Sequence, residues 1–262
     1  MDKDLKRLTV DRRKKILAML SEDGQVYVHE LSDYFSVSEV TIRNDLDQLE
    51  KKNLLIRARG GAIKIENNVA VDQRLIDKYR INQQLKMRIG AKSAELINDF
   101  DTIIIDSGTT TAEIVKNLGR VKNLTVITNA VNIIDHLTNY QDISVVVPGG
   151  YLRNNSLSMV GPFAEKNLRQ LHVDKVFMGV DGFDSRLGVY TPNIEEAYLN
   201  QIMIEIASEV ILVADSSKFK RRSLAFICPL SSIDVVVTDD GIEDDDKKHI
   251  EEAGIKLIIA KK

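Results

Sequence analysis

The chain has 262 residues, of which 44% are hydrophobic and 29% charged; this composition is ordinary for a globular protein, and the length suits two domains. The single cysteine, Cys228, excludes a disulfide framework within the chain, and the charged N-terminus lacks the apolar core of a signal peptide. No run approaches the roughly 18 consecutive apolar residues of a membrane span, so we expect a cytoplasmic protein with no membrane partner.

Charge is unevenly distributed along the chain. The net charge is −3, but residues 1–65 contain 13 Lys and Arg against 11 Asp and Glu. Seven of these basic residues lie in residues 1–15, and five lie in residues 51–64, which contain no acid. Two local basic clusters of this kind fit nucleic-acid contact even though the whole chain is slightly acidic.

The first 52 residues have the pattern of a helix-turn-helix. Apolar spacing predicts helices at 11–22, 29–35 and 39–52, and a short strand at 26–28. The second and third helices are joined by a tight turn, and the third has an apolar stripe on one face. Its start is open between two residues, because Ser38 is a good N-cap while Ser36 with Glu39 also fits a capping box.

The polar face of the third predicted helix carries candidate DNA contacts. They are Ser38, Thr41, Arg43 and Asn44, near the end where a recognition helix touches base edges and phosphates. Arginine suits guanine and asparagine suits adenine. The acids Asp45, Asp47 and Glu50 lie further along and would repel phosphates, so we expect only the first half of the helix to enter the groove. A solvated helix face is the alternative interpretation.

A β-hairpin is predicted directly after this helix, at residues 54–65, with Gly60-Gly61 at or near its turn. Its exposed side carries Arg57, Arg59 and Lys64. A basic hairpin that follows a recognition helix is typical of a wing, whose charges hold DNA phosphates.

The residues quoted so far carry a family resemblance. The stretch from Val37 to Glu50, followed by Leu54 to Ala62, resembles the N-terminal signature of the DeoR family of bacterial transcriptional regulators in order and spacing. Many members have a second arginine where this chain has Asn44, so no base preference is carried over from the family.

The remainder of the chain alternates strands and helices. Residues 66–82 are predicted as a linker that becomes helical, and residues 83–98 as a helix. Its Lys86, Arg88 and Lys92 are expected at the solvated surface; contact of one of them with an anionic ligand is the alternative. Strands are predicted at 102–106, 124–128, 143–147, 173–178, 210–214, 235–238 and 255–259, and helices at 111–118, 130–138, 162–170, 194–208 and 243–252. This alternation indicates an α/β domain with a largely parallel sheet.

Ligands of such sheets bind at the carboxyl ends of the strands, and these ends are polar, glycine-rich or charged here. The turn Asp106–Thr111 offers hydroxyls and backbone N–H groups at a predicted helix N-terminus, which suits an anion. Asp106 itself would repel a phosphate, so it is assigned to neutral hydroxyls of a ligand. Arg153 and Lys218 are the candidate phosphate cations. An ordinary strand-to-helix turn is the alternative for this segment.

These C-terminal motifs also resemble the sensor domain of the DeoR family, so the resemblance covers nearly the whole chain. It implies a fold like that of ribose-5-phosphate isomerase and a phosphorylated sugar as effector, and the stretch from Asp215 to Leu224 is most similar to amino-sugar or hexitol operon repressors, such as that of the N-acetylgalactosamine operon. The family pattern implies pocket positions at Asp106, Ser107, Gly108, Thr109, Thr110, Thr128, Asn129, Gly149, Gly150, Arg153, Asp181, Glu196, Asp215 and Lys218.

The combined prediction is a transcriptional repressor with a winged helix-turn-helix at 5–65, a linker at 66–82 and an α/β sugar-phosphate sensor at 83–262. Its partners are double-stranded operator DNA, a phosphorylated sugar and further copies of the chain, as a dimer or tetramer, because one recognition helix contacts few bases. No cofactor or metal is expected. One alternative is a sugar-phosphate isomerase-like enzyme with a DNA-binding head. The other is a redox or dinucleotide sensor, which a single cysteine and the lack of a G-x-G-x-x-G motif disfavour.

Overall fold

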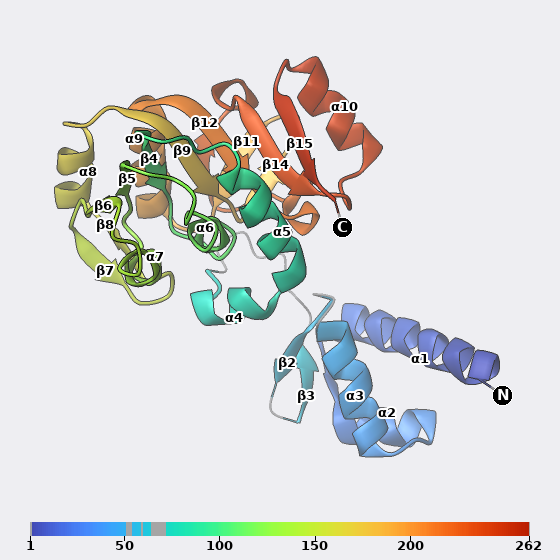
Figure 1. The fold of residues 1–262 in the computed structure, drawn as a ribbon. Helices are drawn as coiled ribbons and strands as arrows, with labels where there is room; N and C mark the ends of the chain where they lie inside the picture. Colours follow the sequence, from blue (N-terminus) through green and yellow to red (C-terminus); the bar gives the residue numbers. More distant parts are fainter. Residues whose placement is uncertain (1, 51–53, 59, 64–71, 262) are drawn as a thin grey trace. The chain divides into compact units, whose positions relative to one another are not determined.

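The computed structural model describes residues 2–50, 54–58, 60–63 and 72–261 (Figure 1). The chain divides into two compact units, Met1–Asn68 with Arg80–Asn82, and Val69–Tyr79 with Gln83–Lys262. Two of the predicted wing residues, Arg59 and Lys64, lie outside the described residues.

The first unit contains the predicted helix-turn-helix and hairpin. Its elements are α1 (Asp2–Asp23), β1 (Gln25–Tyr27), α2 (Val28–Phe35), α3 (Glu39–Glu50), β2 (Ile56–Ala58) and β3 (Gly61–Ile63). The three strands form an antiparallel sheet in the order β1-β3-β2, and the apolar stripes of the three helices meet in one core around Ile16, Leu31 and Ile42.

The start of α3 is settled by local hydrogen bonds. The backbone N–H of Thr41 donates to Oγ of Ser38 at 3.2 Å, so Ser38 is the N-cap. Ser36 instead ends α2 in a left-handed conformation with φ of 52°. The alternative start, with Ser36 as the cap, is therefore wrong.

The second unit is a three-layer α/β domain. Its helices are α4 (Leu75–Arg80), α5 (Gln83–Ala94), α6 (Thr111–Val115), α7 (Val131–Leu137), α8 (Pro162–Leu168), α9 (Ile194–Glu205) and α10 (Asp244–Glu252). The strands of its large sheet are β4 (Thr102–Ile105), β5 (Leu124–Ile127), β6 (Ile143–Val146), β9 (Val173–Gly179), β12 (Ala207–Val213), β14 (Val235–Asp239) and β15 (Lys256–Ala260). The order is β15-β14-β12-β9-β4-β5-β6, and every pairing is parallel, as the alternating pattern predicted.

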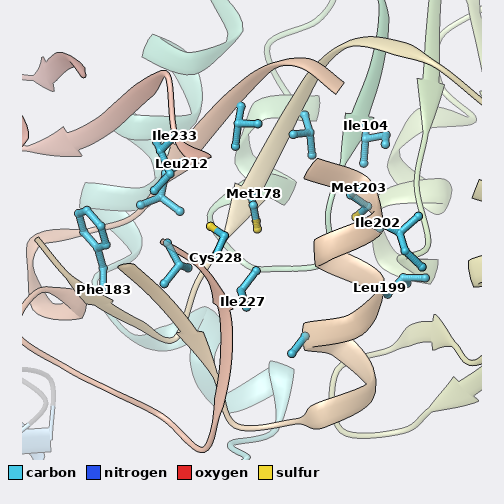
Figure 2. Packing of buried hydrophobic residues seen from close by; sticks show 14 of the residues in the cluster. Ile104, Met178, Phe183, Leu199, Ile202, Met203, Leu212, Ile227, Cys228 and Ile233 are labelled. Atoms are coloured by element: carbon cyan, nitrogen blue, oxygen red, sulfur yellow. The ribbon is translucent and has the colours of Figure 1, made fainter. Parts of the chain in front are cut away.

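The two faces of this sheet bury different side chains because successive residues of a strand point to opposite faces. On β4, Ile103 and Ile105 belong to the core under α5, α6 and α7, whereas Ile104 belongs to the core under α8, α9 and α10. Figure 2 shows the second core, with Met178 of the sheet and Cys228 side by side at its centre. A strand buried on both faces explains the uninterrupted run of isoleucines.

Two antiparallel pieces were not predicted. One is the hairpin of β7 (Tyr151–Arg153) and β8 (Ser158–Val160). The other is a small sheet of β10 (Gly182–Asp184), β11 (Gly188–Thr191) and β13 (Ala225–Cys228), which covers part of the core in Figure 2. Strands of three or four residues are too short to show the alternation on which strand prediction depends.

The predicted helices at 83–98 and 111–118 end earlier than expected. α5 ends at Ala94, where Leu96 N–H and Ile97 N–H bond to carbonyls only three residues back and tighten the last turn. α6 contains only five residues, Thr111–Val115, so it contributes little helix dipole to the turn that precedes it.

We expect Gly90→Ala to destabilise the sensor unit. A Cβ on Gly90 of α5 would lie 2.5–2.8 Å from atoms of Glu113 on α6, so the two helices would have to separate. Overpacking of this kind costs about 1–3 kcal/mol, which a urea titration followed by circular dichroism measures. The matched control is Gly119→Ala, whose Cβ would meet its nearest atom, on Tyr140, at 3.9 Å. Equal midpoints for the two variants would contradict the close approach of α5 and α6.

Candidate functional site

In the first unit, the outward face of α3 carries the predicted DNA contacts. Ile42, Leu46 and Leu49 point into the core, so Arg43 and Asn44 are left exposed on the other side. Thr41 is half-buried, and the exposed Ser38 is engaged as the N-cap. Arg43 contacts Glu39 one turn earlier, an exposed pair that a nearby phosphate or base can replace at little cost.

One of the three acids in the second half of α3, Asp45, does not occupy the outer face as the sequence suggested. Asp45 is only 2% exposed and receives the guanidinium groups of Arg12 and Arg13 from α1. Asp47 pairs with Arg57 at 3.0 Å, and Glu50 accepts the backbone N–H of Arg57. Asp45 is therefore neutralised inside the unit, whereas the side chain of Asp47 is half exposed and Glu50 is exposed along the second half of the helix.

Of the predicted wing cations, Arg57 lies within the described residues. Its guanidinium pairs with Asp47 and donates to the carbonyl of Gly61 at 3.0 Å, across the hairpin. Arg57 thus joins β2 to both α3 and β3. This side chain has a structural task that the sequence did not reveal, besides any contact with phosphates.

In the second unit, a pocket lies at the carboxyl ends of β4 and β9. After β4 the chain adds β5 and then β6 next to one edge of β4. It later returns to add β9 along the opposite edge of β4. Such a reversal of strand order opens the crevice where α/β sheets bind ligands. The pocket is lined by Gln73, Leu75, Lys78, Asp106, Ser107, Gly108, Thr109, Thr110, Ser156, Gly179, Val180, Asp181, Thr191, Glu196, Asn200 and Lys218.

Asp181, just after β9, is the centre of charge in this pocket. Its Oδ1 atom lies 2.7 Å from Nζ of Lys78 and 3.6 Å from Nζ of Lys218. Burial alone would raise the pKa of Asp181, but the two ammonium groups outweigh it and hold the pKa at about 2. Burial lowers the pKa of Lys78, but Asp181 and the other nearby carboxylates together raise it by more. The net shift of the pKa is upward, so Lys78 is charged.

A third lysine, Lys86 of α5, lies nearby. The sequence placed it at the solvated surface, and this was wrong: it is 4% exposed, and its Nζ donates to the backbone carbonyl of Lys78 at 2.6 Å. Burial lowers the pKa of Lys86 to about 8, and the ammonium groups of Lys78 and Lys218 act in the same direction. The pocket region therefore concentrates positive charge.

Asp106, at the end of β4, differs from Asp181. It is 3% exposed, and its Oδ2 accepts a hydrogen bond from Nδ2 of Asn200 at 3.3 Å. Burial raises the pKa of Asp106 well above its usual value, and the negative charge of Glu196 adds to the shift. A carboxyl group with a raised pKa can donate as well as accept hydrogen bonds, which suits the hydroxyls of a neutral ligand portion.

Arg153 on β7 does not line the pocket but holds its wall in place. Its guanidinium bridges Asp72 and Glu196 and donates to Oγ of Ser156 at 3.1 Å. Glu196 also accepts from Oγ of Ser158 at 3.0 Å. The network joins the hairpin β7–β8 to α9 and to the chain segment that precedes α4.

Five further predicted pocket residues lie outside the lining. The hydroxyl of Thr128 accepts the N–H of Ala130 in the turn after β5, and Asn129 donates to the carbonyl of Met159, which ties the end of β5 to β8. Gly149 and Gly150 have φ of 80° and 114° and turn the chain into β7. Asp215 accepts hydrogen bonds from Ser217 and shapes the turn that carries Lys218.

Eight lining residues were not among the predicted pocket positions: Gln73, Leu75, Lys78, Ser156, Gly179, Val180, Thr191 and Asn200. The first three fall in the stretch taken for a linker, where no periodicity marks them. Asn200 had a signal, because it interrupts the apolar run of α9 between Leu199 and Ile202 and is buried. A polar residue in a buried stripe needs a partner.

Residues 12–68 match the family model of the DeoR-like helix-turn-helix domain, and residues 81–240 match that of the DeoR C terminal sensor domain. The chain belongs to the DeoR family. With a helix-turn-helix and a sensor domain of this family, it is a DNA-binding transcriptional regulator rather than an enzyme.

Relatives with the DeoR architecture align over nearly the whole chain. The aga operon transcriptional repressor of Escherichia coli O157:H7 is 38% identical, over an alignment that covers 96% of this chain and 94% of the repressor. The regulator GlpR of Haloferax volcanii is 33% identical, with coverages of 96% and 98%. The transcriptional repressor AccR of Agrobacterium fabrum is 34% identical, with coverages of 89% and 90%.

Solved structures similar to this DeoR-family chain include ribose 5-phosphate isomerase A of Methanocaldococcus jannaschii, with 18% identity and a TM-score of 0.39 over 53% of this chain and 55% of that one. Another is eIF2B beta of Chaetomium thermophilum, with 17% identity and a TM-score of 0.43 over 87% and 63%. Among the described helices, none is long and apolar enough to span a membrane.

The thiol-switch alternative finds no support in the surroundings of Cys228. The side chain is 4% exposed, and burial raises its pKa to about 12. A buried thiol of this kind is not the reactive thiolate that a redox sensor needs.

We expect Asp106→Asn to stabilise the sensor domain near neutral pH. A carboxyl group whose pKa is raised by folding contributes stability that is present below its unfolded pKa, about 3.8, and is lost as the pH rises through the folded value. Thermal unfolding at pH 4 should therefore show little difference between the variant and the wild type. At pH 7.5 the variant should have the higher melting temperature, by about 2–4 °C for each kcal/mol of added stability. Asp142→Asn, at an exposed position, is the control. If the melting temperatures of the variant and the wild type differed by the same amount at both pH values, the raised pKa of Asp106 would be contradicted.

Proposed function

We propose that this regulator represses a sugar-catabolism operon and leaves its operator when a phosphorylated sugar binds the sensor pocket. Residues 5–65 bind double-stranded operator DNA, and the sensor at 83–262 is completed by the end of the segment taken as a linker at 66–82. The observation that carries the proposal is Asp181 with the ammonium groups of Lys78 and Lys218, beside the hydroxyl-rich turn after β4.

A phosphate fits the lysine side of the pocket. Two charged ammonium groups already converge within 4 Å of one carboxylate, so a phosphate oxygen placed there makes charge-assisted hydrogen bonds without a large rearrangement of the lysines. Lys86, whose Nζ lies 2.6 Å from the carbonyl oxygen of Lys78, adds a further ammonium group next to this side of the pocket. An uncharged ligand would leave this concentration of ammonium groups unused.

A polyhydroxylated body fits the opposite side. Thr109, Thr110 and Asn200 offer donors and acceptors, and Asp106 and Glu196 accept from sugar hydroxyls. The names of relatives agree with this chemistry to the extent that one is an aga operon repressor and another a regulator named FruR. A regulator that acts on operator DNA works in the cytoplasm of a bacterial cell.

The pocket wall offers a route from effector to DNA. Asp72 is held by Arg153, the N–H of Leu75 donates to the carbonyl of Asn155 at 2.7 Å, and the carbonyl of Lys78 accepts from Lys86. These contacts fasten the segment that leads out of the linker. A phosphate bound by Lys78 acts directly on this segment, and in the proposed mechanism the linker passes the change to the DNA-binding domain.

We expect Lys218→Ala to keep operator binding and to lose effector response. A hydrogen bond to a charged group contributes about 1.5–3 kcal/mol, so half-maximal release should need roughly 10- to 150-fold more effector. The measurement is fluorescence anisotropy of labelled upstream DNA, titrated with a panel of sugar phosphates. Lys220→Ala, an exposed lysine two residues away that pairs with Glu243, should respond as the wild type does. Normal release from the Lys218 variant would move the phosphate site elsewhere.

We expect Arg43→Ala to weaken operator binding by about 1–3 kcal/mol, because an arginine on a recognition helix contacts base edges. Binding to unrelated DNA should fall much less, which a competition titration at fixed salt measures. Arg169→Ala removes an arginine of similar exposure from the sensor domain, where it pairs with Glu205, and should change neither affinity. An equal loss on both DNAs would reduce Arg43 to a phosphate contact.

A further inference from the structure

Strand β6 forms one edge of the large sheet. Among the described strands it pairs only with β5, and the carbonyl of Val146 accepts the N–H of Thr128 on that side at 3.1 Å. The backbone groups of successive strand residues point to alternate sides. The N–H and C=O groups of Val145 and Val147 therefore point outward, away from the sheet.

The side chains on this edge are apolar and exposed. Val145, Val146 and Val147 are 36%, 38% and 41% exposed, so apolar side chains at the end of the strand are partly open to solvent, whereas Ile143 at its start is buried. From Ile143 to Leu152 the sequence contains no charged residue. Natural proteins protect an exposed edge with lysine, proline or a bulge, and here Pro148 stands only after the strand has ended.

The apolar surface continues beyond the strand. Gly149 and Gly150 turn the chain into β7, where Tyr151 and Leu152 are 47% and 48% exposed. The ring of Tyr151 lies against Gly161 at the start of α8, and Phe163 on that helix is 75% exposed. These elements gather at one end of the sensor domain in Figure 1. Exposed apolar side chains beside an open strand are typical of an interaction surface.

We propose that β6 pairs antiparallel with β6 of a second copy of this chain, which joins two sensor domains into one continuous sheet. Val145 and Val147 supply the backbone hydrogen bonds, and Tyr151, Leu152 and Phe163 pack around the joined edges. The proposal rests on the proposed function for one point only, that two DNA-binding domains act together.

The chemistry of the edge selects a second copy as the partner. An outward row of N–H and C=O groups is complementary to itself when a two-fold axis reverses one strand, so identical edges satisfy each other. Residues 143–152 contain no charged side chain, so two copies of this edge strand do not repel each other through these residues. Both properties follow from the residues 143–152 alone.

The first experiment places a charge on the edge. Sedimentation velocity of full-length protein, without DNA or effector, should show that Val146→Lys halves the size of the wild-type assembly, from two chains to one chain of 29.5 kDa if the wild type is a dimer. Met87→Lys, on an exposed position of α5, is the matched control and should assemble normally. A wild-type chain that is monomeric at micromolar concentration overturns the proposal.

The second experiment does not depend on the folding of a lysine variant. Cys228 is buried, so a cysteine introduced at Val145, Val146 or Val147 is the reactive thiol. Under mild oxidation, the variant closest to the two-fold axis should form a disulfide-linked dimer, while Leu187→Cys, on an exposed turn, should not. An oligomeric wild type whose β6 variants give no cross-link, and whose Val146→Lys form still assembles, overturns the proposal, because the chains then meet at another surface. This outcome would not affect the proposed function, because operator binding and effector release are measured in separate experiments.

Discussion

Strand β4 pairs with β5 on one side and with β9 on the other, and its Asp106 N–H continues the second pairing by donating to the carbonyl of Phe177. This central position places the ends of β4 and β9 next to each other, and the chain leaves them in opposite directions. The turn after β4 and the turn after β9 thus meet across one crevice. Every other wall of the pocket, from α9, the hairpin β7–β8 and α4, is built around that meeting point.

Two carboxylates at this crevice have opposite electrostatic surroundings. Asp181 is held ionised by lysines, whereas burial and Glu196 raise the pKa of Asp106. In the proposed function, one side of the pocket therefore receives the anionic group of the effector and the other side receives its hydroxyl groups. A ligand that carries both groups on one small molecule satisfies both sides, whereas inorganic phosphate alone leaves the second side empty.

The sequence predicted the helix-turn-helix, the parallel sheet and the polar strand ends because these depend on local signals. Ser38 as a cap, apolar stripes at helical spacing and buried runs such as Ile103 to Ile105 are visible in any short window. The burial of Lys86, the place of Lys78 in the pocket and the salt bridges of Asp45 depend on residues far apart along the chain. The small sheet of β10, β11 and β13 was missed for the same reason, since Ala225–Cys228 pairs with a strand more than thirty residues earlier.

Asp45 joins two helices that the sequence presents as separate. Its buried carboxylate forms ion pairs with the guanidinium groups of two consecutive residues of α1, Arg12 and Arg13. If α1 and α3 rotated independently, the Asp45 charge would lose its partners or become exposed to solvent. The long first helix, α1, is therefore mechanically coupled to α3. A rotation of α1 about these two ion pairs is thus transmitted to α3.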